Sequence, residues 1–496
     1  MKKIVILLFL IMALQHKIVA QKVYEFNSTC QQAYQEMTKL KFSTTKILTA
    51  KARQANPENL IPDFIDNYID FFTLFLNEYI AEYKKLKPII ENRINNFKQG
   101  NTTSPFNLYC LSMLYVQKGT VEIKFGETWN AAWNFRKAYQ LIKENKKNFP
   151  TFLPNDMLYG GLQTVVGTIP KGYKWLANIL GLKGSVAEGN KLLTNFVYST
   201  DPWARLMSNE GDFMYCYLQF YVLNKKEEAL QFIHTKKLDI VNNLLFAYMA
   251  ANLAINNKQI DYAKDVINNR NKSAEYFQTH VWDFEMGFVK LYKLETQEAI
   301  TYFEKYLNTF KGRFYVKDVY QKISWCYYLQ GNMVAAENAR NNIIKKGATD
   351  ADADKQALKE AKSMQWPNTM LLKARLLSDG GYNKEALQLL TSKHINNFDN
   401  EEEQLEYAYR LGRINDDLGK YNDAINWYNK TIEIGEQRTE YFAARAALQT
   451  GMIYEKLGKK TEAINYYKRC LNMNEEDYKN SIDQKAKSGI ARCKGE

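Results

Sequence analysis

The sequence predicts an all-α fold, in which a solenoid of stacked helical hairpins follows an N-terminal helical region. Almost every segment carries apolar residues at the spacing of one helix face, whereas alternating β-branched runs are few. Units of similar composition also recur near the C-terminus at a fixed offset, which indicates a repeat architecture. The chain of 496 residues is too long for one compact core, so it forms either several domains or one extended array.

Two C-terminal units carry the repeat most clearly. Each has a small residue, then a glycine, then an alanine and an aromatic: Leu411, Gly412, Gly419, Tyr421, Ala424 and Tyr428 in the first, and Gly451, Tyr454, Gly458, Ala463 and Tyr467 in the second. Gly458 follows Gly419 by 39 residues, which equals a repeat of about 34 residues plus an extension near 435–441. In this pattern the chain resembles the tetratricopeptide repeat (TPR) family.

Each consensus position has a packing reason. Small residues such as Gly412 and Gly451 let two antiparallel helices approach closely, and Tyr428 and Tyr467 are expected to fill the space left at the neighbouring unit. The second glycine of each unit ends its first helix, where the backbone needs a positive φ.

The repeats extend upstream in weaker form, and together they predict an array over residues 206–475. The upstream units are marked by Tyr217, Ala229 and Ile233; Ala247, Ala251 and Ala263; Met286, Gly287, Ala299 and Phe303; Tyr320, Tyr327, Gly331 and Ala336; and Ala374, Gly381, Ala386 and Leu390. A capping helix is expected within 476–496. Residues 21–205 form the N-terminal helical region, with long helical segments predicted over 64–94, 106–115 and 127–146.

A glycine-rich, apolar helical hairpin is predicted over 158–193. It starts with paired glycines, Gly160 and Gly161, breaks at residues 167–170 and turns at 181–184 before a glycine-leucine helix. This order resembles the eukaryotic tetratricopeptide repeat protein 39 family and its fungal inclusion-clearance relatives. The charged pair of that family after the turn is replaced here by Ser185 and Val186. The resemblance implies a TPR-like solenoid with adaptor or clearance roles, in some members linked to lipids, and no catalytic residues.

Residues 1–20 have the pattern of a secretory signal peptide. Lys2 and Lys3 precede an apolar run over 4–14, and Ala20 is a small residue before the expected cleavage at Gln21. The run is too short to anchor the chain across a bilayer. The sequence therefore predicts an exported protein, periplasmic or associated with the cell envelope.

The net charge is positive but dilute. The whole chain carries +13, and removal of the three lysines in residues 1–20 leaves 13 − 3 = +10. No block of five or more like charges occurs, which favours a solvated lysine-rich surface over a polyanion-binding one. A protein or peptide segment is the expected partner, an anionic lipid surface is the second candidate, and nucleic acid is not expected.

The sequence offers no catalytic residue, no metal site and no cofactor motif. The four histidines are far apart, and no HExxH, phosphate-binding GxxxxGK[ST] or GxSxG pattern occurs. The cysteines include no C-x-x-C pair. Cys470 and Cys493, expected on adjacent helices, form the one pair that suggests a disulfide test.

Candidate partner contacts lie on the first helices of the repeats, which line the groove of such arrays. Aromatic and arginine side chains on one face are typical of interface anchors, and the outward positions are Asp318, Gln321, Trp325, Tyr328, Arg375, Tyr409, Arg413 and Asp416. Packing of Trp325 and Tyr328 between repeats is an equally good interpretation.

The glycine-rich hairpin has a functional alternative. Its second helix could rest on lipid through Lys171, Tyr173, Lys174, Trp175, Leu176 and Ile179. A structural role is favoured, because glycine-rich apolar helices pack against each other more readily than they insert.

Overall fold

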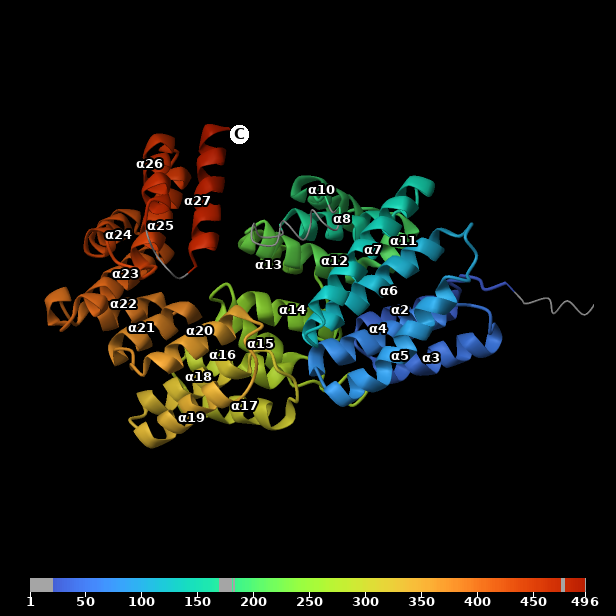
Figure 1. Cartoon of the computed structure of the whole chain (residues 1–496), viewed down its shortest axis with the longest axis horizontal. Coiled ribbons are helices and arrows are strands. Elements are labelled where there is room, and N and C mark those ends of the chain that lie inside the picture. The colour runs from blue at the N-terminus through green and yellow to red at the C-terminus, as the bar shows by residue number, and fades with distance from the viewer. Residues whose placement is uncertain (1–20, 169–180, 182, 474–477, 496) are drawn as a thin grey trace, which may run out of the picture. The chain divides into compact units, whose positions relative to one another are not determined.

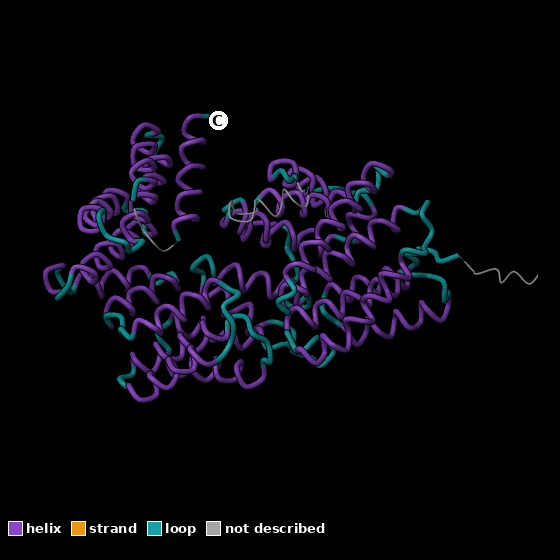
Figure 2. Tube along the Cα trace, viewed as in Figure 1, coloured by secondary structure: helices purple, strands orange, loops and turns teal. Residues whose placement is uncertain are grey.

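The computed structural model describes residues 21–168, 181, 183–473 and 478–495. Within these ranges the chain is helical with short connections and contains no β-strand (Figure 2), only the isolated bridges Lys22–Gly100 and Val23–Asn59. The predicted all-α class is confirmed. In the same ranges, no helix combines the length and the apolar character needed to cross a membrane.

Two compact units make up the chain. The first contains the residues up to Leu253 together with Val266–Val281 and Thr309–Gly312, and the second contains Ala254–Asp265, Trp282–Asn308 and Arg313–Glu496. The boundary expected at residue 205 was placed where the sequence pattern changes, whereas these units are defined by their internal contacts. That boundary stays a prediction.

The first unit is a set of antiparallel helices, shown in blue to green in Figure 1. In chain order they are α2 (Ser28–Thr38), α3 (Phe42–Ala55), α4 (Ile61–Asn77), α5 (Ile80–Phe97), α6 (Pro105–Lys124), α7 (Thr128–Asn148), α8 (Pro154–Gly167), α10 (Val186–Val197), α11 (Pro202–Leu206), α12 (Ser208–Tyr217), the π-helix η2 (Leu218–Val222), α13 (Lys226–Thr235) and α14 (Leu244–Ile255). Helix α15 (Ile260–Asn269) contributes residues to both units.

One expected helix is in fact two. The segment 64–94 was predicted as continuous, but α4 ends and α5 begins on either side of Glu78, which has the left-handed φ of 49°. The Glu78 carboxylate is buried and accepts a hydrogen bond from Lys124 of α6 at 2.7 Å. This buried ion pair between helices holds a backbone conformation that non-glycine residues rarely adopt.

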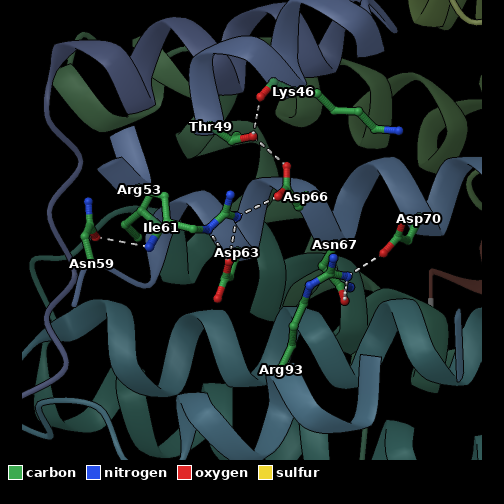
Figure 3. Close-up of polar contacts among 10 residues, drawn as sticks. All are labelled: Lys46, Thr49, Arg53, Asn59, Ile61, Asp63, Asp66, Asn67, Asp70 and Arg93. Carbon is green, nitrogen blue, oxygen red and sulfur yellow. Dashed lines mark hydrogen bonds and ion pairs between the residues drawn. The ribbon is translucent and has the colours of Figure 1, made fainter. Parts of the chain in front are cut away.

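Carboxylates on α4 tie it to the helices on both sides (Figure 3). Arg53 of α3 donates to Asp63 and Asp66, at 2.7 Å each, and Arg93 of α5 donates to Asp70 at 2.5 Å. These pairs fix the register of three successive helices, because the planar guanidinium has little freedom once it forms charge-assisted bonds.

The described part of the glycine-rich hairpin packs very closely. A Cβ on Gly160 of α8 would lie 2.8 Å from the Gly189 carbonyl oxygen of α10. Atoms do not approach to this distance without a shift, so α8 and α10 cross at a point where only glycine fits.

A half-buried carboxylate with a raised pKa makes the first unit sensitive to pH. Glu210 accepts hydrogen bonds from the hydroxyls of Tyr34 and Tyr68, the latter at 3.0 Å. Burial raises the pKa of Glu210 to about 7, although both hydroxyls lower it. In the unfolded chain the pKa of a glutamate is about 4.3.

Between pH ~4.3 and about 7, the Glu210 carboxyl is therefore protonated in the folded state and ionised in the unfolded state. Its stabilising effect is complete below pH ~4.3 and disappears as the pH rises through about 7. We expect the unfolding free energy of the first unit to fall from pH 5 to pH 8, by on the order of 1–3 kcal/mol from this group. Urea unfolding at both pH values should show this fall in the native protein and a flatter profile in Glu210→Gln. Equal slopes in the two proteins would contradict the assignment.

The second unit is an ordered series of helical hairpins, yellow to red in Figure 1. They are α16 (Val281–Tyr292) with α17 (Thr296–Thr309), α18 (Val316–Leu329) with α19 (Met333–Lys345), α21 (Thr369–Gly380) with α22 (Asn383–Thr391), α23 (Glu401–Asp417) with α24 (Tyr421–Gly435), and α25 (Phe442–Lys456) with α26 (Lys460–Leu471). A single helix α20 (Asp352–Ser363) follows α19, the short 3-10 helix η3 (Ile395–Asn397) follows α22, and α27 (Lys479–Lys494) packs on α25 and α26.

The glycine positions of the repeat have the predicted packing role. A Cβ on Gly412 would lie 2.5 Å from the Tyr428 ring, and one on Gly451 would lie 2.6 Å from the Tyr467 ring. Each tyrosine thus fills space over the glycine of its own hairpin and not at the neighbouring unit, as had been expected; Tyr467 also contacts Gly489 of α27. The turn glycines after α23 and α25 have φ of 72° and 76°, as predicted for helix ends.

Candidate functional site

A groove of about 860 Å³ runs along the second unit. Its walls are the first helices of successive hairpins, α18, α21 and α23, together with α20 and the starts of α25 and α27. The lining alternates charged, amide and aromatic side chains, so it can contact both the backbone and the side chains of a bound segment.

Helix α20 is an insertion in the repeat series that sequence reasoning missed. Its buried residues Ala357 and Ala361 pack it against the α18–α19 hairpin. Asp354 accepts backbone hydrogen bonds from Tyr315 at 2.7 Å and Asp318 at 3.1 Å, and so caps the start of α18. Burial raises the pKa of Asp354 to about 6 against these hydrogen bonds, which lower it.

Trp325, a predicted partner contact, lies beneath α20. Its side chain is only 2% exposed, and its indole N–H donates to Glu360 of α20 at 2.6 Å. Gln321 donates to the same carboxylate at 2.6 Å. Trp325 therefore lines the groove at its floor, and its packing against α20 also agrees with the structural interpretation of this residue.

Two arginines line the groove beside aromatic and acidic side chains. The Arg375 guanidinium lies 5.1 Å from the Trp325 ring centre, and its ion pair with Asp379 is long, at 3.7 Å. Arg410 binds Glu406 at 2.7 Å. Burial lowers the pKa of Arg410, but Glu406 and the Tyr441 phenol raise it by more, so its pKa lies above the usual range.

The structure brings together half of the predicted contacts. Asp318, Gln321, Trp325 and Arg375 line the groove. Tyr328 instead stacks on Trp366 at 4.6 Å and donates to the Pro367 carbonyl at 3.0 Å.

The other three predicted contacts lie on α23 outside the groove lining. Tyr409 is buried against Tyr441 and Phe442. Asp416 accepts a hydrogen bond from Tyr428 at 3.2 Å, and Arg413 pairs loosely with Asp417 at 3.7 Å.

Several lining residues were not predicted from the sequence. They are Glu402, Glu403, Glu406 and Arg410 on α23, Trp366 in the connection before α21, and Tyr441, Phe442 and Tyr478 at the starts of α25 and α27. The 402–406–410 spacing was a usable signal, because residues four apart share one face of a helix.

Metal ligands, cysteines and the candidate lipid contacts are the remaining features that bear on function. Among the described residues, no group of three or more His, Cys, Asp or Glu side chains could hold a metal ion. All six cysteines are buried and none forms a disulfide, including the Cys470–Cys493 pair singled out from the sequence. The candidate lipid contacts, Lys171, Tyr173, Lys174, Trp175, Leu176 and Ile179, lie outside the described residues.

Solved structures offer distant similarities of low structural agreement. A human IFIT1 dimer with PPP-AAAA is 12% identical, with coverage of 90% of this chain and 91% of that one and a TM-score of 0.34. The APC/C hetero-tetramer Cut9-Hcn1 is 11% identical, with coverage of 93% of this chain and 95% of that one and a TM-score of 0.28. The Naa15/Naa10 complex bound to HypK-THB is 11% identical, with coverage of 94% of this chain and 65% of that one and a TM-score of 0.26.

Sequence comparison gives one clear assignment. No curated protein matches the chain. The tetratricopeptide repeat model matches residues 403–476, which span the hairpins α23–α24 and α25–α26. The same hairpins have the glycine–tyrosine packing and the positive-φ turns described above. Residues 403–476 of this all-helical chain are therefore similar to tetratricopeptide repeats in sequence and in packing.

Proposed function

We propose that the protein is an exported, non-catalytic scaffold that binds a segment of a protein partner in the groove of its second unit. Tetratricopeptide repeats are typical of protein-interaction scaffolds. The observation that carries the proposal is the groove itself, about 860 Å³ in volume and lined by Arg375, Arg410, Tyr441 and Tyr478. Arginine and tyrosine are the residue types most often found at the energetic centres of interfaces.

The groove is organised before a partner binds. Glu360 is held by Gln321 and Trp325, and Arg410 by Glu406. A bound segment then meets side chains that have already lost much of their freedom, which reduces the entropy cost of association.

Export is part of this proposal and rests on residues 1–20. The basic start, the apolar run and Ala20 support cleavage before Gln21 and a place in the periplasm or cell envelope. N-terminal sequencing of the protein purified from its native envelope fraction tests this part. A chain that begins at Gln21 is expected, and one that begins at Met1 would contradict it.

A charge-introduction experiment tests the groove. The double variant Gln356→Lys/Glu402→Lys places two long cations in the lining without removing a buried contact. A matched control, Asn465→Lys/Glu462→Lys, makes the same change of charge at exposed positions of α26. Like-charge or steric conflict in an interface costs several kcal/mol, so the groove variant should recover partners at least ~10-fold less well.

The readout is quantitative capture from the envelope fraction, with a melting curve of each variant. Proteins recovered by the native chain and by the control, but lost with the groove variant, support the proposal. Equal recovery by all three proteins would remove the groove from the function.

A further inference from the structure

We propose that the groove of the second unit accepts a basic peptide segment, whose lysine or arginine side chains pair with Glu360 of α20 and with Glu402 and Glu403 of α23. This inference rests on the proposed function and specifies the chemistry of the partner. It starts from the ion pairs that the groove lining forms and from those that it leaves unformed.

The lining has a surplus of negative charge, because six carboxylates and four cationic side chains line the groove. Three of the carboxylates already pair with cations of the chain: Asp318 with Lys322 at 2.8 Å, Asp352 with Lys355 at 2.9 Å and Glu406 with Arg410 at 2.7 Å. The other three carboxylates form no ion pair within the described residues, and they are those of Glu360, Glu402 and Glu403. The charge that remains for a ligand is therefore negative.

Neutral donors hold Glu360 in the lining. The Trp325 indole N–H and the Gln321 amide each donate to its carboxylate at 2.6 Å. Neither donor carries a charge, so these bonds fix the position of the negative charge without neutralising it. A ligand cation that binds Glu360 therefore meets a side chain whose conformational freedom is already lost.

Glu402 and Glu403 lie in the first turn of α23, but the cap of this helix does not depend on their carboxylates. The Asn400 side chain caps α23 by accepting a hydrogen bond from the Glu403 N–H at 2.9 Å. Within the described residues the Glu402 carboxylate accepts no hydrogen bond, and that of Glu403 accepts one, from the Asn368 amide at 3.3 Å. Burial raises the pKa of Glu402, and the Glu440 carboxylate raises it further. A cation bound here would relieve this repulsion.

Aromatic rings line the same groove. The ring centres of Tyr441 and Tyr478 are 5.3 Å apart, and Tyr478 is 42% exposed. The face of a tyrosine ring attracts an ammonium or guanidinium group. Carboxylates and aromatic faces in one groove are thus suited to the side chains of lysine and arginine.

The distribution of these groups favours a peptide over other ligands. No three acidic, histidine or cysteine side chains of the described residues could hold a metal ion, and the carboxylates on α20 and α23 require cations spaced along the ligand. The lining also offers the amide side chains of Gln321, Gln356, Gln365, Asn368 and Asn400. Amide groups both donate and accept hydrogen bonds, as the backbone of a bound peptide requires. Nucleic acid would bring its phosphates against the carboxylates and be repelled.

Binding of defined peptides tests this inference on the full chain. Fluorescence anisotropy at low ionic strength would compare three labelled probes: a decapeptide of alternating Lys and Ser with blocked ends, and its Gln–Ser and Glu–Ser counterparts. The Lys–Ser peptide should bind most tightly. In Glu402→Gln/Glu403→Gln its affinity should fall about tenfold, because two partly exposed charge pairs are lost. Glutamine keeps the size of each side chain and the oxygen that accepts from Asn368.

Two further variants separate the groove from general charge effects. Glu385→Gln/Glu462→Gln removes two carboxylates that are likewise in the first turns of helices, α22 and α26, but are exposed outside the groove lining. This control should leave the affinity unchanged. The reversal variant Glu402→Lys/Glu403→Lys should prefer the Glu–Ser peptide. Unchanged melting curves would show that each variant is folded.

Three results would overturn the inference. The Lys–Ser peptide binds no better than the Gln–Ser peptide, or the Glu–Ser peptide binds most tightly, or the control variant loses as much affinity as the groove variant. Any of these, with groove-dependent partner capture intact, rejects the basic-segment inference alone. Loss of groove dependence in that capture rejects the proposed function instead.

Discussion

Replacement of Tyr467 by alanine should destabilise the C-terminal hairpins by about 3–5 kcal/mol, the usual cost of truncating a fully buried aromatic residue. Tyr467 is 0% exposed and lies between Gly451 of α25 and Gly489 of α27. Its hydroxyl donates to Glu455 at 2.5 Å. The truncation leaves a cavity that two glycine faces cannot close, and it leaves the Glu455 carboxylate with one hydrogen bond fewer.

Hydrogen exchange of the α25–α27 amides at increasing urea measures this loss where it occurs. The neighbouring Tyr466 provides the control, because it is partly exposed and donates to Asn429 at 2.8 Å. Tyr466→Ala should cost much less. If both variants lose protection equally, the buried tyrosine does not hold these hairpins together.

A second large effect is expected at Gly451. Gly451→Ala places a Cβ 2.6 Å from the Tyr467 ring, closer than any unstrained contact. Overpacking of this kind costs about 1–3 kcal/mol, because the ring or the two helices must move. The urea midpoint for loss of α25–α27 protection should fall accordingly.

The mechanism behind that effect is a direct contact, so the two sites must be coupled. In the double variant Gly451→Ala/Tyr467→Leu the smaller side chain leaves room for the new methyl group. Its loss of stability should be smaller than the sum of the two single losses, as residues in contact are non-additive. Additive losses would mean that the alanine acts on something other than Tyr467.

The repeats could be predicted from the sequence because their signals are local. Positions 412 and 451 require glycine because another side chain of the same hairpin approaches closely. The turn positions require it because their φ is positive. The spacing of such positions is visible without knowledge of tertiary contacts. Upstream of α23 the chain is likewise helical at the positions of the weaker units.

Other elements depend on contacts distant in sequence, and these were missed. The break between α4 and α5 falls at Glu78, which is held by Lys124, 46 residues away, and no glycine or proline marks it. Helix α20 carries alanines at helical spacing, but its packing over α18 depends on Asp354 and Glu360.

The site was predicted in part for a similar reason. Helical spacing on α18 and α21 identified four residues that line the groove. On α23 it selected Tyr409, Arg413 and Asp416, whereas the lining ends at Arg410: Arg413 and Asp416 lie farther along the helix, and Tyr409 is buried against Tyr441 and Phe442. Where a groove ends along a helix depends on the packing of neighbouring helices, which helical spacing alone does not show.

Site-specific photo-crosslinking from within the groove tests the central claim most directly. A photoreactive amino acid would replace Glu402 in the groove and, separately, Glu462 on the exposed face of α26, in the full chain expressed in its native cells. The account predicts a discrete protein crosslinked from position 402, absent from position 462 and displaced by excess unlabelled native chain. Crosslinks of equal yield and identity from both positions, or none from position 402, would contradict it.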